Sequence, residues 1–269
     1  MDSIREYETL EDVITTLRME LSNDLEGKLS IVLVEGEDDI SFVNRIFEKD
    51  VVCFESPSGK EGVRKLVEAE DIADCRIIGI RDRDYESVEG YPPRLFCYDT
   101  CCLETMLLSC EGVVEGIHAV YYKGSMEQGT FIMNAMRQLA PLSMLREKNE
   151  RYDFGINFQR AALSEFVSKE NESITYGELF SKLGQSQEML EDCRQEAGKM
   201  QDCQLLDKTN GHDICRFLGK ILKSGKGDLG EKRLREILIC SYRTEDFRNT
   251  YLYQKLSDYQ QRHQLCYVE

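Results

Sequence analysis

Acidic residues follow the predicted β-strands in the first half of the chain. Glu35 comes directly after the apolar run 29–34, and Asp82 and Asp84 come after the run 76–80. Ligands of an open parallel sheet bind beyond the carboxyl ends of its strands, so we expect these carboxylates to share one pocket. Side chains at positions i and i+2 of an extended segment point to the same side, which predicts that Asp82 and Asp84 face this pocket together.

Three further acids extend this predicted cluster, because Asp39 lies four residues after Glu35, and Asp99 and Glu104 follow a fourth strand-like run. Neighbouring carboxylates raise one another's pKa and oppose folding, and a divalent cation relieves that repulsion. Because the ligands are oxygens without His or Cys, the cation that fits is Mg²⁺ or Mn²⁺ and not zinc. Such a site predicts metal-dependent phosphoryl transfer. Helix capping is the alternative role for acids at such positions, and we favour it for Glu37, Asp38 and Glu86.

Strand-like and helix-like segments alternate through this half of the chain. Short β-branched runs without helical spacing predict buried strands over residues 29–34, 51–54, 76–80 and 94–98. Apolar residues three and four positions apart predict helices over residues 4–25, 38–47, 62–69 and 103–108. This alternation is typical of an α/β fold whose mainly parallel sheet is flanked by helices.

The second half of the chain is predicted to be mostly helical. The candidate helices cover residues 126–139, 159–167, 177–183, 189–206, 212–223 and 231–240. We therefore expect three parts: an N-terminal helix over residues 1–27, an α/β catalytic domain over 28–125, and a helical C-terminal region over 126–269.

The most distinctive stretch of the second half is LLDKTNGHD, residues 205–213. Its Asn-Gly pair is a turn signal, and either His212 or Asp213 is in a position to begin the next helix. For this motif a structural capping role and a role in a functional site stay equally open.

The chain carries a formal charge of −16, and most of it lies in the first part. Residues 1–110 contain 26 acidic and 12 basic side chains, a net charge of −14. An acidic surface repels phosphate backbones, so binding of DNA or RNA needs bound metal ions, a local basic patch or a basic partner. The segment 216–235 is the best candidate patch, although a solvated helical face explains its charges nearly as well. Its candidate nucleic-acid contacts are Lys220, Lys223, Lys226, Lys232 and Arg233.

Three features predict a cytoplasmic protein without a membrane span. No apolar run approaches the roughly 20 residues that cross a bilayer. The N-terminal residues have neither the basic start nor the apolar core of a secretory signal. Eleven irregularly spaced cysteines in a chain of 269 residues fit reduced thiols better than a disulfide framework.

Two motifs resemble those of a known family. The stretches IVLVEGEDD (31–39) and IIGIRDRD (77–84) are similar, in order, spacing and strand context, to the Toprim domain. That α/β catalytic domain occurs in topoisomerases, bacterial primases, OLD-family nucleases and ribosomal-RNA maturation ribonucleases. The later YDTCCLET (98–105) and NGHD (210–213) resemble the stand-alone, OLD-like branch, which includes the AriB-type effector of PARIS anti-phage systems. The Toprim resemblance covers about residues 28–125, and the narrower one extends weakly to about residue 225.

The resemblance implies a role for each matching residue. Glu35 matches the Toprim glutamate, a metal ligand or general acid/base, and Asp82 and Asp84 match its paired metal ligands. Asp39 matches a second acid of the OLD-like branch, and Glu104 its downstream acid. Lys208 is a candidate cation for the phosphate, a role that OLD-like nucleases give to a lysine.

The resemblance also implies an activity. It indicates a Mg²⁺-dependent nuclease that hydrolyses DNA or RNA, with transfer RNA among the candidate substrates, and that acts in anti-phage defence with an ABC-type ATPase. Topoisomerase and primase activities are disfavoured, because a strand-passage domain and a zinc module are not expected in this chain. One alternative is a toxin-like effector whose main property alone is to bind its ATPase partner. Another is a Toprim module that binds metal or nucleotide without catalysis, and a homodimer stays open.

Overall fold

The computed structural model describes residues 9–268, and within them the predicted strands form a four-stranded parallel sheet in the order β2-β1-β3-β4. The strands are β1 (Ser30–Val34), β2 (Val51–Glu55), β3 (Ile77–Arg81) and β4 (Leu95–Cys97). In the register, Ile31 of β1 pairs with Val52 on one side and Ile77 on the other. The predicted α/β class with a parallel sheet is confirmed. Of the helix predicted over residues 4–25, the part before residue 9 lies outside the described residues.

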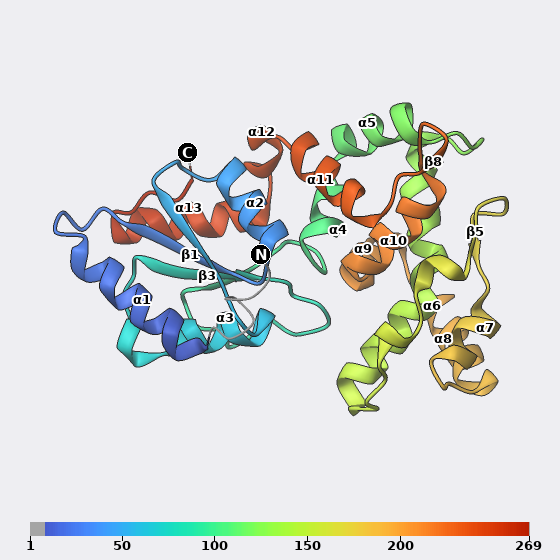
Figure 1. The fold of residues 1–269 in the computed structure, drawn as a ribbon, viewed down its shortest axis with the longest axis horizontal. Helices are drawn as coiled ribbons and strands as arrows, with labels where there is room; N and C mark the ends of the chain where they lie inside the picture. The colour runs from blue at the N-terminus through green and yellow to red at the C-terminus, as the bar shows by residue number, and fades with distance from the viewer. Residues whose placement is uncertain (1–8, 269) are drawn as a thin grey trace. The chain divides into compact units, whose positions relative to one another are not determined.

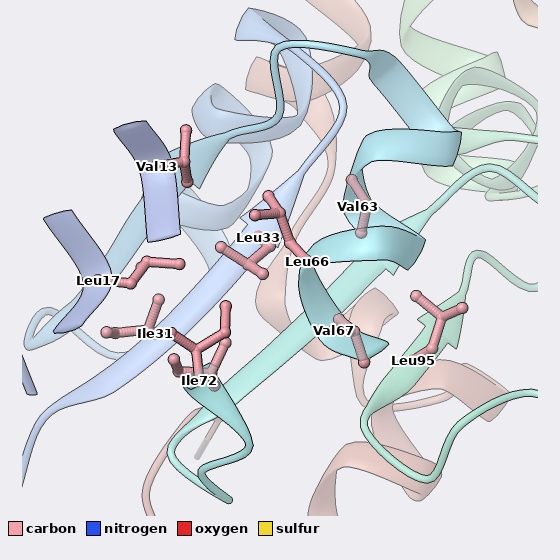
Figure 2. Packing of buried hydrophobic residues seen from close by; sticks show 10 residues of the cluster. Val13, Leu17, Ile31, Leu33, Val63, Leu66, Val67, Ile72 and Leu95 are labelled. Carbon is pink, nitrogen blue, oxygen red and sulfur yellow. The ribbon is translucent and has the colours of Figure 1, made fainter. Parts of the chain in front are cut away.

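Helices cover both faces of this sheet. They are α1 (Leu10–Asn23), α2 (Glu37–Ile46), α3 (Gly59–Glu68) and α13 (Tyr251–His263). Figure 1 shows α1 and α3 on one face and α2 and α13 on the other. Between the sheet and the first pair lies a core of aliphatic side chains, which includes Leu17, Ile31 and Leu66 (Figure 2). Gly79 of β3 is required there, because a Cβ would lie 2.7–2.8 Å from the side chains of Val67 and Val63.

The end of the chain returns to the sheet. Tyr259 of α13 packs edge-on against Phe96 of β4, with ring centroids 5.6 Å apart. The hydroxyl of Tyr267 donates a 2.7 Å hydrogen bond to the carbonyl of Arg76, next to β3. We call the resulting compact unit the sheet unit: of the described residues it comprises 9–83, Ser87–Asp99 and 243–268, which include α12 (Thr244–Phe247).

The remaining residues, Asp84–Glu86 and Thr100–Tyr242, form a second compact unit, the helical unit. The predicted boundaries at residues 27 and 125 do not coincide with those of the two units. The reason is that α13 packs on the sheet through aromatic contacts with residues far away in the sequence. A local sequence pattern cannot predict such contacts.

Helices dominate the helical unit. They are α4 (Leu103–Leu108), α5 (Glu111–Tyr121), α6 (Gln128–Tyr152), α7 (Tyr176–Lys182), α8 (Gln187–Ala197), α9 (Asp202–Lys208), α10 (Gly211–Ile221) and α11 (Glu231–Ser241). Two short hairpins join them, β5 (Val167–Ser168) with β6 (Ser173–Ile174), and β7 (Lys223–Ser224) with β8 (Gly227–Asp228). Within residues 9–268, no helix has the length and apolar composition needed to cross a membrane.

Three helix predictions in this unit are wrong in extent. The helix expected to end at residue 139 continues to Tyr152, because Pro141 is buried within α6 and the packing of that face outweighs the proline. Residues 159–167 form no α-helix but 3₁₀ turns, including Phe158–Arg160, before the strand at Val167. The helix expected over 189–206 is interrupted after Ala197, where Gly198 ends α8.

Candidate functional site

The carboxyl ends of the two central strands bring Glu35 and Asp82 together. Glu35 follows β1 and Asp82 follows β3, and the two strands are parallel neighbours. Oε1 of Glu35 accepts a 2.6 Å hydrogen bond from the backbone N–H of Asp82. Gly59, the first residue of α3, has a φ of 54°, and a Cβ there would be 3.9 Å from Oε2 of Glu35. The Glu35 carboxylate therefore lies between the end of the sheet and the N-terminus of α3.

Asp39 is the third carboxylate at this end of the sheet. Its Oδ2 accepts a 3.1 Å hydrogen bond from the backbone N–H of Gly36, and its Oδ1 accepts one of 2.6 Å from the Tyr98 hydroxyl. Burial raises the pKa of that hydroxyl well above its ordinary value, and the charges of Asp39, Asp82 and Glu35 raise it further. Three carboxylates thus raise the pKa of one buried phenol, so all three lie near Tyr98 in the sheet unit.

Two residues near these acids were missed by sequence reasoning. Tyr98 directly follows β4, and its position just beyond a strand of the same parallel sheet was the available signal. Arg81, the last residue of β3, is completely buried and donates a 2.8 Å hydrogen bond to the Tyr91 hydroxyl. The Arg81 guanidinium also lies 3.7 Å from Oε1 of Glu61, at the start of α3. A charged residue at the end of an apolar strand was the signal for Arg81.

Asp84 departs from the expected geometry. The strand ends at Arg81, and Asp84 has a φ of 49°, in the left-handed region. Its backbone N–H donates a 2.8 Å hydrogen bond to the carbonyl of Cys101, so the residue belongs to a turn of the helical unit. The prediction that an extended segment points Asp82 and Asp84 to one side is therefore wrong in its premise. Asp and Asn tolerate this conformation better than most residues do, which explains why the turn is accepted at Asp84.

Asp99 has a capping role instead of a place among the clustered acids. Its Oδ2 accepts a 2.6 Å hydrogen bond from the backbone N–H of Tyr251, and its Oδ1 one of 2.7 Å from that of Leu252. These are the first two residues of α13, whose N-terminal N–H groups lack partners within the helix. The carboxylate therefore anchors the returning C-terminal helix to the end of β4.

Glu104 lies in the first turn of α4, in the helical unit, and is only 9% exposed. The first residue of α10, Gly211, gives it room: a Cβ at Gly211 would come 2.0 Å from Oε2 of Glu104 and 2.7 Å from Sγ of Cys102. The positive end of the α10 dipole favours a carboxylate at this point. The glycine of the NGHD motif therefore seats the predicted downstream acid against the start of α10.

The other residues of the NGHD motif have structural partners. Asn210 is the N-cap of α10, and its side chain accepts a hydrogen bond from the backbone N–H of Asp213. Asp213 is buried and takes two hydrogen bonds from Arg146, of 2.5 and 2.8 Å. His212 is exposed, and its Nδ1 lies 2.9 Å from Oε1 of Glu231. The helix thus begins after Asn210, one residue before the earlier of the two predicted starts.

We predict that His212 titrates above its ordinary pKa of about 6.5. The hydrogen bond to Glu231 raises the pKa of His212. Partial desolvation of the imidazole lowers the pKa, but by less. Because the folded-state pKa is the higher one, protonated His212 stabilises the fold fully below about pH 6.5, and this stabilisation is lost as the pH rises through the folded-state pKa. NMR titration of the imidazole, with Glu231→Gln for comparison, measures it. An equal His212 pKa in both proteins would contradict the assignment.

Lys208, the predicted phosphate cation, ends α9 in the helical unit. Its Nζ lies 2.5 Å from Oε1 of Glu147, and its side chain is 30% exposed. The same ammonium lies 5.9 Å from the ring centroid of Tyr85, which is the neighbour of Asp84 in the chain. Lys208 is thus oriented by a carboxylate and lies close to the turn that carries one of the predicted metal ligands.

The predicted nucleic-acid contacts do not lie along one helix face. Lys220 is on α10, Lys223 begins the β7–β8 hairpin, and Lys226 is exposed in its turn. Lys232 and Arg233 are exposed in the first turn of α11. Their common feature is the junction between α10 and α11, where the hairpin connects the two helices.

The acids of the sheet unit suit a hard divalent cation. Glu35, Asp39 and Asp82 offer only carboxylate oxygens, and all three lie near the carboxyl ends of β1 and β3. Mg²⁺ is characteristically held by one or two protein carboxylates together with water and phosphate oxygens. The donor set therefore fits the predicted Mg²⁺ or Mn²⁺, which these residues would hold.

The site of the sheet unit consists of strand-end carboxylates, a buried tyrosine and a helix N-terminus. Comparisons with protein-family models, with curated proteins and with solved structures found no match to this chain.

Proposed function

We propose that this chain is a Mg²⁺-dependent nuclease that hydrolyses phosphodiester bonds of DNA or RNA. The observation that carries the proposal is the hydrogen bond of 2.6 Å that joins the Glu35 carboxylate to the backbone of Asp82 across two adjacent strand ends. Asp39 adds a third carboxylate through its contact with Tyr98. The similarity of the two motifs to the Toprim domain, and of the later stretches to its OLD-like branch, supports the same assignment.

The three acids would hold the cation, and the carboxylates of Glu35 and Asp39 are already oriented. A divalent ion bound there supplies positive charge that stabilises the phosphate during hydrolysis and favours deprotonation of water. Tyr98 fixes the carboxylate of Asp39, while the Asp82 backbone fixes that of Glu35. Glu35 is the residue placed to accept a proton from water as a general base. Asp84 and Glu104 stay predicted further ligands, and Lys208 a predicted phosphate contact.

A partner belongs to the proposal. The chain carries a formal charge of −16, which opposes the approach of a polyanionic substrate outside the basic residues of the helical unit. The OLD-like resemblance implies an ABC-type ATPase as partner, and a basic surface on such a partner would offset that repulsion. We therefore expect the chain alone to be a slow nuclease and to act as an effector within such a complex.

We predict slow Mg²⁺-dependent cleavage that is abolished by EDTA, because net repulsion disfavours binding of the substrate to the isolated chain. The test incubates the purified chain with labelled single-stranded DNA, duplex DNA and transfer RNA at two salt concentrations, with Mg²⁺ or with EDTA. Cleavage of any substrate that persists in EDTA would contradict the metal dependence. Fast turnover with shallow salt dependence would contradict the need for a basic partner.

A further inference from the structure

A pocket of about 550 Å³ lies in the helical unit, away in sequence from the Glu35 motif. Its walls come from the segment around Ala162, from α10 and from the start of α11. The charged residues of its lining are two cations, Arg216 and Lys220, and two carboxylates, Asp228 and Glu231. A volume of this size is typical of sites for small ligands, which range over roughly 300–1,000 Å³.

The Asp228 carboxylate forms ion pairs with three lysines. Its Oδ1 lies 2.7 Å from Nζ of Lys169 and 3.3 Å from that of Lys223, and its Oδ2 lies 3.7 Å from that of Lys220. The hydrogen bonds from Lys169 and Lys223 lower the pKa of the Asp228 carboxyl, despite some burial. One negative charge thus holds three positive ones in place, and the cluster keeps a positive excess.

Glu231 organises a second group of cations. Its Oε2 accepts a 3.0 Å hydrogen bond from Arg216, its Oε1 lies 2.9 Å from His212, and Arg235 is 3.8 Å away. Burial alone would raise the pKa of Glu231, but His212 and Arg216 outweigh it and lower that pKa to about 2. Across both groups, five lysine and arginine side chains face two carboxylates, so positive side chains outnumber negative ones around the pocket.

The pocket is also held rigidly. The backbone N–H of Gly230 donates a 2.9 Å hydrogen bond to the carbonyl of Gly219, which joins the start of α11 to α10. A Cβ at Gly219 would come 2.6 Å from the carbonyl carbon of Gly230, so this approach requires glycine. Gly230 itself has a φ of 83°, in the left-handed region that glycine favours. The walls that carry Arg216 and Lys220 are therefore preformed.

We propose that this pocket binds the phosphate group of a nucleotide, through Arg216 and Lys220. Each of these side chains is about one-third exposed, so both are accessible from the pocket while their carboxylate partners hold them in position. Cationic hydrogen bonds to phosphate are shorter and stronger than neutral ones, and Arg offers a bidentate fork. The phosphate has two sources, a free nucleotide or the end of a nucleic-acid strand. The proposal does not rest on the nuclease assignment.

The test measures binding in EDTA, so that neither cleavage nor a metal-held phosphate contributes. The probes are radiolabelled AMP, in equilibrium dialysis, and a fluorescent 5′-phosphorylated oligonucleotide, in anisotropy, with adenosine and the unphosphorylated oligonucleotide for comparison. Lys220→Ala should raise Kd at least about tenfold, because a charge-assisted hydrogen bond is lost. Lys199→Ala is the matched control: it removes the same charge from an exposed lysine after α8 that is not part of the pocket lining.

Binding of AMP alone identifies a free nucleotide as the source, and binding of the oligonucleotide alone identifies a strand end. Either result supports the phosphate site if Lys220→Ala weakens it and Lys199→Ala does not. Circular dichroism and the milder Lys220→Gln, which should weaken binding by a similar factor, separate this effect from misfolding. Equal losses in Lys220→Ala and Lys199→Ala, or binding that does not depend on the phosphate, would overturn the proposal, as would a Kd weaker than about 10 mM for both probes.

Discussion

Replacing Glu35 with glutamine is expected to lower Mg²⁺-dependent cleavage by at least about 100-fold, within the range that a general base contributes. The amide keeps the size of the side chain and an oxygen that can still accept the hydrogen bond from the Asp82 backbone. It removes the negative charge that would hold a cation and the basicity needed to deprotonate water. The fold should persist, because the substitution relieves repulsion among neighbouring carboxylates.

Glu37→Gln is the matched control for this prediction. It makes the same chemical change two residues later, at an exposed position in the first turn of α2. Cleavage rates and Mn²⁺ affinity, from isothermal titration, are compared among the wild-type chain and the two variants. If Glu35→Gln retains cleavage within a few-fold of wild type while folding normally, Glu35 is not a catalytic residue and the nuclease proposal loses its main support. Equal losses in both variants would point to general electrostatics and not to a site.

Local patterns predicted the sheet well, because buried parallel strands have a strong sequence signature. The β-branched run at 29–34 and the helix expected over 103–108 match β1 and α4 to within a residue. The same reasoning failed where long-range packing decides. Pro141 is accommodated inside α6, and α13 is added to the sheet unit by contacts of Tyr259 and Tyr267 with residues more than 150 positions earlier. No window of neighbouring residues contains that information.

Part of the candidate site could likewise be predicted from local sequence patterns, and part could not. The pairing of Glu35 with Asp82 could be predicted, since it needs only two adjacent parallel strands and an acid after each. The left-handed turn at Asp84 could not, because alternation holds only while the chain stays extended. Tyr98 was missed because its hydroxyl matters through Asp39, a residue of another element. Which groups an acid or a cation contacts depends on the tertiary structure. The position of that acid or cation in the chain can be read from the sequence alone.

Replacing Arg146 with alanine is expected to destabilise the helical unit by about 3–5 kcal/mol, as is found when one partner of a buried ion pair is removed. Asp213 would be left as a buried carboxylate, since its side chain is 3% exposed and Arg146 provides both of its charged hydrogen bonds. The guanidinium also lies 4.1 Å from the ring centroid of Phe158, and this stacking would be lost as well. The aspartate of the NGHD motif is thus predicted to act in folding.

Arg137→Ala provides the control on the same helix. Arg137 pairs with Asp202 at 2.6 Å, but both side chains are more than half exposed, so its loss should change the free energy of unfolding by no more than about 1 kcal/mol. Urea unfolding is followed by circular dichroism and tyrosine fluorescence, because the chain contains no tryptophan. If Arg146→Ala unfolds at the same urea concentration as Arg137→Ala, the buried pair does not hold α6 against α10. The buried carboxylate of Asp213 would then need a role in binding, and the capping interpretation of the motif would be limited to Asn210.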